Sequence, residues 1–240
     1  MDDMPNLVTI IEKLLGGMPI AEHIGRWEDT IFSLIIVAAI SFVALAASRK
    51  VRAVPGRLEA ACEIFVGGID DFVCGIIGPA GRRFTPFIGK LFIYILFMNL
   101  SGLIPLFKSP TANWSVTLAL GLCVFVYVQY SGIKTRGFIG FIDHLMGSPR
   151  GILAFSVVIP IMMFFLHIIS ELVRPISLSL RLRSNIWGDE LLLSFISGLG
   201  IGWVPLLVFN SLLAILASIV QAAVFSLLAT IYFALTLAEE

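Results

Sequence analysis

Apolar runs of about 20 residues constrain this chain more than any other feature of its sequence. A helix needs about 20 apolar residues to cross the hydrocarbon core of a bilayer, where its backbone polar groups must be satisfied internally. Hydrophobic residues make up 58% of the 240 residues and charged residues only 13%, whereas a soluble domain has about 25% charged residues. The sequence therefore predicts an all-α polytopic membrane protein. Its apolar runs cover about 30–48, 84–104, 113–133, 152–197 and 203–236.

Basic residues between the runs predict how the chain crosses the membrane, because positive charges favour the cytoplasmic side. They are Arg49, Lys50, Arg52 and Arg57 after the first run, Arg82 and Arg83 before the second, and Lys134 and Arg136 after the third. We therefore expect the N-terminus outside and the C-terminus in the cytoplasm. The chain is divided into an N-terminal periplasmic segment, 1–28, and one membrane domain, 29–240.

Some segments do not fit upright spanning helices. Residues 58–80 have helical apolar spacing interrupted by four acids, Glu59, Glu63, Asp70 and Asp71, which predicts a helix in the cytoplasmic interface. Residues 137–150 are expected to form an inner loop. The last two runs are longer than one crossing needs, and we expect them to form a hairpin of steeply tilted helices.

Ionisable side chains inside the fourth run are the strongest indication of function. The window 164–193 holds seven of them: His167, Glu171, Arg174, Arg181, Arg183, Asp189 and Glu190. A charge at the bilayer centre costs about 2.5–3.5 kcal/mol on insertion scales, so such residues face protein or water and mark functional sites.

Helical spacing separates these residues into two sides. At about 100° per residue, four polar side chains fall within about 80° of Arg181: Arg174, Asn185, His167 and Glu171. Glu190 falls about 180° away and is expected to point to the opposite side. Pro175 removes one backbone donor and can kink the helix.

The same stretch resembles the signature of subunit a of F-type ATP synthases. The family pattern has a basic residue and Pro, then Ser-Leu, and then Leu-Arg-Leu-Phe-Gly-Asn. This chain is similar, with ELVRPISLSLRL-x-x-N followed by GDEL. The resemblance implies that Arg181 is the family's essential arginine. It also matches Arg174, Asn185 and Glu190 to the basic, Asn and acidic residues of the family.

Two lone amides in apolar sequence extend the resemblance. Gln221 begins a segment similar to the family's Gln-Ala-x-x-Phe, whose Gln lies near the essential arginine. Asn99 precedes a Pro-ended turn, as in the family. From the residues alone, each amide equally fits a hydrogen bond between helices.

The resemblance implies a stator subunit of the Fo sector, of bacterial type and in the inner membrane, which is not itself catalytic. Arg181 would separate two offset half-channels that lead protons to and from a rotating ring. Glu190, Asn99 and Gln221 are assigned to the outer half-channel, and His167, Ser170 and Glu171 to the inner one. The implied partners are the c-ring, a subunit b dimer, the other Fo and soluble ATPase subunits, and membrane lipid.

Several positions depart from the family pattern. Arg183-Ser184 replaces the usual Phe-Gly, and Arg183, about 200° from Arg181, is expected to pair with Glu190 or Asp189. His167 stands where many relatives have Glu, and Asn113 replaces a common Asp. Ala214 lies where relatives often have His.

Other functions fit the sequence less well. A net charge of zero gives no indication of nucleic-acid binding, and Cys62, Cys74 and Cys123 lack metal-ligand spacing, so no cofactor is predicted. A secondary transporter would show an inverted repeat, and no clear one is seen. A membrane anchor would not need Arg181 and Glu190 in the membrane. Sodium coupling in place of proton coupling stays open.

Overall fold

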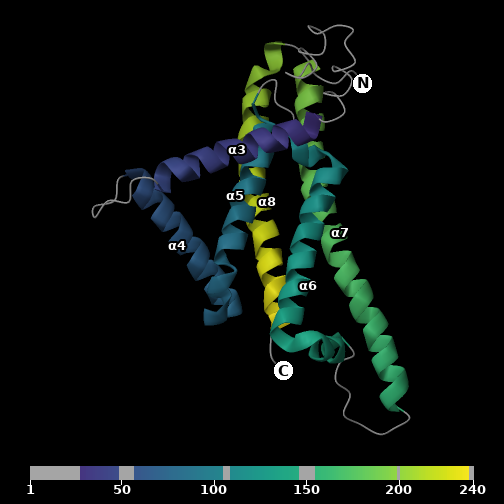
Figure 1. Ribbon diagram of the computed structural model, residues 1–240. Coiled ribbons are helices and arrows are strands. Elements are labelled where there is room, and N and C mark those ends of the chain that lie inside the picture. Colours follow the sequence, from purple (N-terminus) through teal and green to yellow (C-terminus); the bar gives the residue numbers. More distant parts are fainter. Residues whose placement is uncertain (1–27, 49–56, 105–108, 146–154, 199–200, 238–240) are drawn as a thin grey trace, which may run out of the picture.

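The computed structural model describes residues 28–48, 57–104, 109–145, 155–198 and 201–237, and within these ranges it contains helices and no strand (Figure 1). The α-helices are α3 (Glu28–Ser48), α4 (Arg57–Ile77), α5 (Thr85–Ser101), α6 (Trp114–Leu145), α7 (Phe155–Gly198) and α8 (Val204–Leu237). Short 3-10 turns are η1 (Pro79–Arg83), η2 (Pro110–Ala112) and η3 (Ile201–Trp203). The predicted all-α class is confirmed. Apart from Glu28, the predicted segment 1–28 lies outside the described residues.

Three helices are long and apolar enough to cross a membrane. They cover Trp114–Thr135 of α6, Met162–Ile196 of α7 and Val204–Leu237 of α8. Many of their large apolar side chains are exposed, as expected for surfaces that meet lipid or partner helices. The apolar helix α5 has 17 residues and is therefore about 25 Å long. The chain is a polytopic membrane protein.

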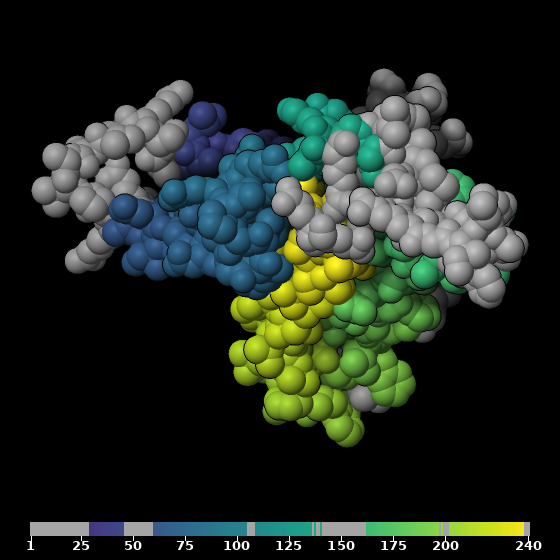
Figure 2. All heavy atoms as spheres, turned by 90° about the horizontal axis from the view of Figure 1, so that it is seen from below, coloured from purple at the N-terminus to yellow at the C-terminus, as the bar shows by residue number. Residues whose placement is uncertain are grey.

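The two long C-terminal runs form the predicted helical hairpin. α7 ends at Gly198 and α8 runs from Val204 to Leu237, close to the predicted limits of these two runs. Pro175 lies within α7, which continues through it to Gly198. Seen from below, α8 lies between α7 on one side and α4 and α5 on the other (Figure 2). α8 is thus the central helix of the bundle.

The hydrophobic core follows one face of α8. Ala222, Phe225, Ala229 and Phe233 are fully buried, at helical spacing, and they meet apolar residues of every helix from α4 to α7. At one end, the Phe233 ring stacks on Phe84 with ring centroids 4.5 Å apart. This packing fixes α8 against its neighbours, and with it the polar residues that α8 carries.

The N-terminal helices differ from the prediction of one upright span followed by a flat interfacial helix. In Figure 1, α3 lies across the bundle, and α4 descends obliquely to the base of α5. Asp70 fixes this base, because it pairs with Arg82 at 3.2 Å and accepts a hydrogen bond from Thr85 at 2.7 Å. Asp70, one of the four acids of the predicted interfacial helix, is therefore a structural residue.

The expected inner loop is also partly helical. Helix α6 continues to Leu145 beyond a kink at Gly137, whose φ of 74° is in the left-handed region. Glycine adopts this conformation at little cost because it has no Cβ. The kink redirects the segment after it away from the axis of the first part of α6 (Figure 1). His144 is therefore in a helix, although its side chain lies outside the described part.

Close packing of α6 against α7 gives a first prediction. A Cβ added at Gly121 would lie 2.8 Å from the Pro175 carbonyl oxygen, so Gly121→Val must push the two helices apart. We expect it to destabilise the assembled protein by about 1–3 kcal/mol, as overpacking does, measured as a lower midpoint of thermal unfolding in detergent.

The matched control is Gly75→Ala in α4, where an added Cβ meets no atom within 4 Å. Its unfolding midpoint should stay near that of the unmodified protein. An unchanged midpoint for Gly121→Val would show that α6 and α7 are not in close contact at this point.

Candidate functional site

The three arginines of α7 lie in three different environments. Arg181 is exposed, and no described residue forms a hydrogen bond or ion pair with its guanidinium. Arg174 and Arg183 are both half-buried and engaged with other groups. A guanidinium keeps its charge at any accessible pH. Within the described part of α7, Arg181 therefore offers an uncompensated positive charge on the outer surface of the bundle.

Small residues flank Arg181 along its exposed face. Ser177 and Ser184 are exposed and lie within about 60° of Arg181 on the helix. At Gly188, on the same side, an added Cβ would meet no atom within 4 Å. Small side chains allow a second helix to approach closely. This small-residue stripe (Ser177, Ser184 and Gly188) leaves Arg181 as the longest side chain on this part of the helix.

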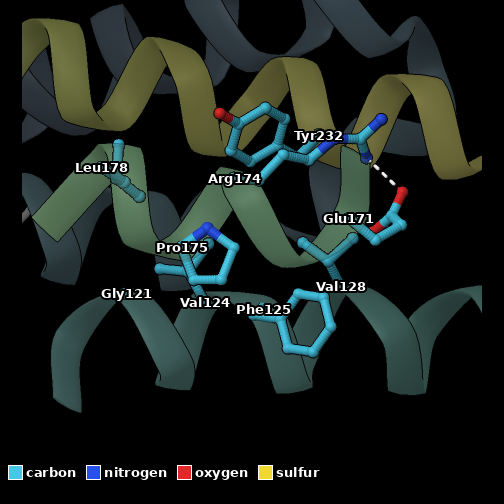
Figure 3. A pocket seen from close by; sticks show the side chains of 9 residues that line it. All are labelled: Gly121, Val124, Phe125, Val128, Glu171, Arg174, Pro175, Leu178 and Tyr232. Atoms are coloured by element: carbon cyan, nitrogen blue, oxygen red, sulfur yellow. Dashed lines mark hydrogen bonds and ion pairs between the residues drawn. The ribbon is translucent and has the colours of Figure 1, made fainter. Parts of the chain in front are cut away.

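Arg174 is neutralised by a neighbouring acid. Its guanidinium pairs with the Glu171 carboxylate, which also accepts a hydrogen bond from Gln129 of α6. The Arg174 Cζ atom lies 5.1 Å from the centre of the Tyr232 ring of α8. Figure 3 shows Arg174, Glu171 and Tyr232 at the cavity between α6, α7 and α8. Arg174 is thus held within the bundle, although it lies only about 20° from Arg181 around the helix.

This inner cavity is narrow. It leaves about 10 Å³ for the centres of water molecules, and one water needs roughly 10–15 Å³ by the same measure. Of the three residues assigned to the inner half-channel, Glu171 lines this cavity and the other two do not. His167 Nδ1 donates to the Met163 carbonyl oxygen at 3.2 Å. Ser170 is exposed.

Arg183 does not form the ion pair expected from its spacing. Its Nε donates to the Ala112 carbonyl oxygen of η2 at 3.3 Å, and its Cζ lies 5.4 Å from the centre of the Trp114 ring. The expected pairing of Arg183 with Glu190 or Asp189 is therefore wrong. The physical reason is that η2 and the start of α6 pack on α7 here, and they supply an acceptor and an aromatic face.

Asn185 connects the Arg181 face of α7 to α8. It lies one turn beyond Arg181, and its Nδ2 donates to Gln221 Oε1 at 2.7 Å. Gln221 is buried, and its Nε2 has no partner among the described residues. The structure thus brings Arg181, Asn185 and Gln221 into one region between the outer face and the helix interface.

Glu190 lies on the opposite side of α7, where it lines an outer cavity between α5, α7 and α8. The cavity leaves about 30 Å³ for the centres of water molecules, which is room for about two waters. Its polar or small side chains are Asn99, Asp189, Glu190, Asn210, Ala214 and Ser218. Glu190 and Asn99 therefore share one cavity, and Gln221 lies one turn beyond Ser218 on α8.

The buried turn η2 orients Asn99. Thr111 Oγ1 donates to Asn99 Oδ1 at 3.0 Å, and Ser109 Oγ lies 2.7 Å from Thr111 Oγ1. Asn99 Nδ2 remains without a partner among the described residues, and so does Asn210 Nδ2. Both amides are buried donors beside a cavity that has room for water. Such donors are normally satisfied, by protein or by ordered water.

Sequence reasoning did not single out four residues that the structure brings to these sites. Asn210 and Ser218 lie on the same side of α8 as Gln221. The helical spacing of positions 210, 218 and 221 in the sequence indicates this polar stripe. Gln129 was a further lone amide in apolar sequence. Asp189 was counted among the ionisable residues of 164–193, but the only contact predicted for it was with Arg183. No group of His, Cys, Asp and Glu that could hold a metal occurs among the described residues.

Comparison with known proteins gives consistent matches. The sequence model of the ATP synthase A chain family matches residues 30–234. ATP synthase subunit a of Protochlamydia amoebophila is 35% identical, covering 99% of this chain and 90% of the relative. The corresponding protein of Oleidesulfovibrio alaskensis is 38% identical over 91% and 89% of the two chains. ATP synthase subunit a 3 of Pelobacter propionicus is 39% identical over 95% of each.

Proposed function

Because this chain belongs to the ATP synthase A chain family, we propose that it is the stator subunit in which Arg181 separates two proton half-channels. As a component of ATP synthase in the inner membrane, it takes part in proton transport and ATP synthesis but is not itself the catalyst. The observation that carries the proposal is the exposed guanidinium of Arg181, which has no hydrogen bond or ion pair with the described residues and lies beside the small-residue stripe of α7.

The proposed partner of this face is the c-ring, whose subunits each carry one carboxyl group within the membrane. Two unit charges about 4 Å apart interact by about 4 kcal/mol at an effective dielectric of 20. Beside Arg181, the ring carboxyl therefore loses about a thousandfold in proton affinity. It releases its proton there and is neutral again where it meets lipid. Arg174 cannot supply this charge, because Glu171 already compensates it.

The proposed outer half-channel runs along the cavity lined by Asn99 and Glu190 toward Gln221 and Asn185. The proposal is supported by the directions of Glu190 and Arg181, which face opposite sides of α7. The cavity that Glu190 lines therefore lies toward the bundle interior and not on the ring face. The proposed inner half-channel uses His167, Ser170 and Glu171. Because Glu171 is paired with Arg174 beside a cavity for about one water, proton transfer there requires this pair to open.

The proposed orientation puts the start of α5 and the end of α6 on the cytoplasmic side. Arg83 Nη2 donates to Thr135 Oγ1 at 3.4 Å, so Arg82, Arg83 and Lys134 lie at the same end of the bundle. Basic residues gather on the cytoplasmic side of membrane proteins. The C-terminal end of α8 lies at this end as well (Figure 1). The subunit b dimer and the soluble subunits are proposed partners from family membership alone.

Site-directed cross-linking tests which face meets the ring. Cysteines replace Ser177 and Ser184 in a chain without Cys62, Cys74 and Cys123, and each carries a photoreactive group in the assembled complex. We expect both to capture ring subunits, because both side chains are exposed beside Arg181.

The matched control is Ser179→Cys, since Ser179 lies in the same helix but is 0% exposed. It should capture no ring subunit. Capture of lipid alone from positions 177 and 184 would contradict the proposed rotor-facing surface.

A further inference from the structure

We propose that Asp189 is a second proton-carrying carboxylate of the outer half-channel, which passes protons between the outer water and Glu190. The inference rests on the proposed function and extends it to a residue to which the family resemblance assigns no role. It starts from the juxtaposition of Asp189 and Glu190 in one cavity. Both line the space between α5, α7 and α8.

Among the described residues, Glu190 is the only other titratable side chain that lines this cavity with Asp189. Helix α5 contributes Asn99, Gly102 and Leu103, and α8 contributes Asn210, Ala214 and Ser218. The nearest basic residue along α7, Arg183, is engaged with the Ala112 carbonyl and the Trp114 ring. Asp189 itself forms no hydrogen bond or ion pair with any described residue. The Asp189 carboxylate is therefore available to bind and release a proton.

Two buried amides indicate that water occupies the space beside these acids. Asn99 is 3% exposed and Asn210 is 7% exposed, and the Nδ2 donors of both lack a described partner. A buried donor that is left without a hydrogen bond is energetically unfavourable. The cavity has room for about two waters, which can accept from the amides and donate to the carboxylates. Such waters connect Asp189 to Glu190.

The residue opposite these acids explains why a second carboxylate is needed. Ala214 of α8 lines the same cavity with its methyl group. Alanine cannot bind a proton. In this chain the second titratable group of the cavity therefore comes from α7, as Asp189, rather than from α8.

The proposed transfer forms and breaks only O–H bonds. A hydronium ion of the outer water gives a proton to the Asp189 carboxylate, which becomes neutral. Asp189 then gives a proton to a cavity water, and that water gives one to the Glu190 carboxylate. Asp189 regains its negative charge, and Glu190 carries the proton toward the ring. When Glu190 has released this proton toward the ring, both carboxylates are again in their starting, negatively charged state.

Passive proton flux through the membrane sector tests this order. Vesicles that hold the complex are stripped of the soluble subunits, and flux is driven by a potassium diffusion potential. We expect Asp189→Asn to lower the flux about tenfold, because water and Glu190 keep a slower path open. Asp189→Glu, which keeps the carboxylate, should conduct near the unmodified rate.

Glu190→Gln, measured in parallel, separates the two proposals. If Glu190→Gln lowers the flux and Asp189→Asn does not, the inference about Asp189 fails and the proposed function stands. If neither change lowers the flux, the outer half-channel as proposed fails as well.

A second-site variant distinguishes proton transfer from a purely structural role. Asp189→Asn combined with Ala214→His places a titratable group back in the cavity from α8. We expect flux to return, with a pH dependence moved toward neutral because histidine titrates nearer neutral pH. The control pairs Asp189→Asn with Ala214→Gln, which has similar bulk but cannot titrate, and it should stay slow. Equal recovery with both would overturn the inference.

If the Ala214→His combination does not copurify with the ring, Asp189→His serves instead, because it leaves the buried position 214 unchanged. It should conduct, with the same displacement of the pH dependence toward neutral. A pH dependence identical to that of the unmodified protein would overturn the inference.

Discussion

Vesicles that contain the Arg181→Ala variant are expected to show no ATP-driven acidification, although the variant chain still assembles with the ring. Arg181 makes no hydrogen bond or ion pair with the described residues, so its charge is available to a partner at the surface and is not needed for folding. The expected loss of acidification is therefore large. Removing an interaction of about 4 kcal/mol with a ring carboxyl restores about a thousandfold in that carboxyl's proton affinity. Proton release to the stator then becomes too slow to support rotation.

Arg183→Gln is the matched control on the same helix. Arg183 contacts the Ala112 carbonyl and the Trp114 ring, so its loss should lower thermal stability while acidification continues. Arg181→Lys gives a finer test, because a lysine covered by the ring can lose its proton and let protons leak between the half-channels. Acidification at the normal rate in Arg181→Ala would refute the proposed function.

Helical spacing was sufficient to predict which sides of α7 carry Arg181 and Glu190. The nine residue steps from Arg181 to Glu190 turn the helix by about 180°, and in the structure Arg181 is exposed and Glu190 lines an interhelical cavity. The limits of α7 and α8 also followed from the apolar runs. Within one helix, a regular period fixes the direction of a side chain relative to its neighbours.

Contacts between distant segments could not be predicted in this way. Arg183 meets Ala112 and Trp114, about 70 residues earlier in the chain, because η2 packs on α7. Asn210 reaches the outer cavity because α8 lies between α5 and α7. These pairings depend on how the helices assemble, and hydropathy and spacing contain no information on that assembly.

The same limit applies to the N-terminal part. Apolar content predicted helices over 30–48 and 58–80, and helices are present. The lower end of α4 is held at the start of α5 by the Asp70 contacts with Arg82 and Thr85. A carboxylate in an amphipathic pattern looks like a solvated residue until the tertiary partner is known.

Glu190→Gln should reduce passive proton flux by about a hundredfold, the lower end of what a positioned proton-transfer group contributes. Glutamine keeps the size of the side chain and can hold the cavity waters in place, but it cannot take up a proton. Assembly should be unchanged, because the core of the bundle does not include Glu190. Flux driven by a diffusion potential, divided by the amount of copurified ring, measures the effect per complex.

Asp71→Asn is the control for the loss of a carboxylate as such, since Asp71 is exposed on α4 and does not line the outer cavity. It should conduct normally. Glu190→Asp should give an intermediate proton flux. It keeps a carboxyl group, but its side chain is one methylene shorter, so the carboxyl group lies farther from the cavity waters. Normal flux in Glu190→Gln would mean that protons reach the Asn185–Gln221 pair by another route. Since Glu190 and Arg181 lie on opposite sides of α7, a slow Glu190→Gln variant with an intact ring contact would separate the outer proton path from the rotor-facing charge.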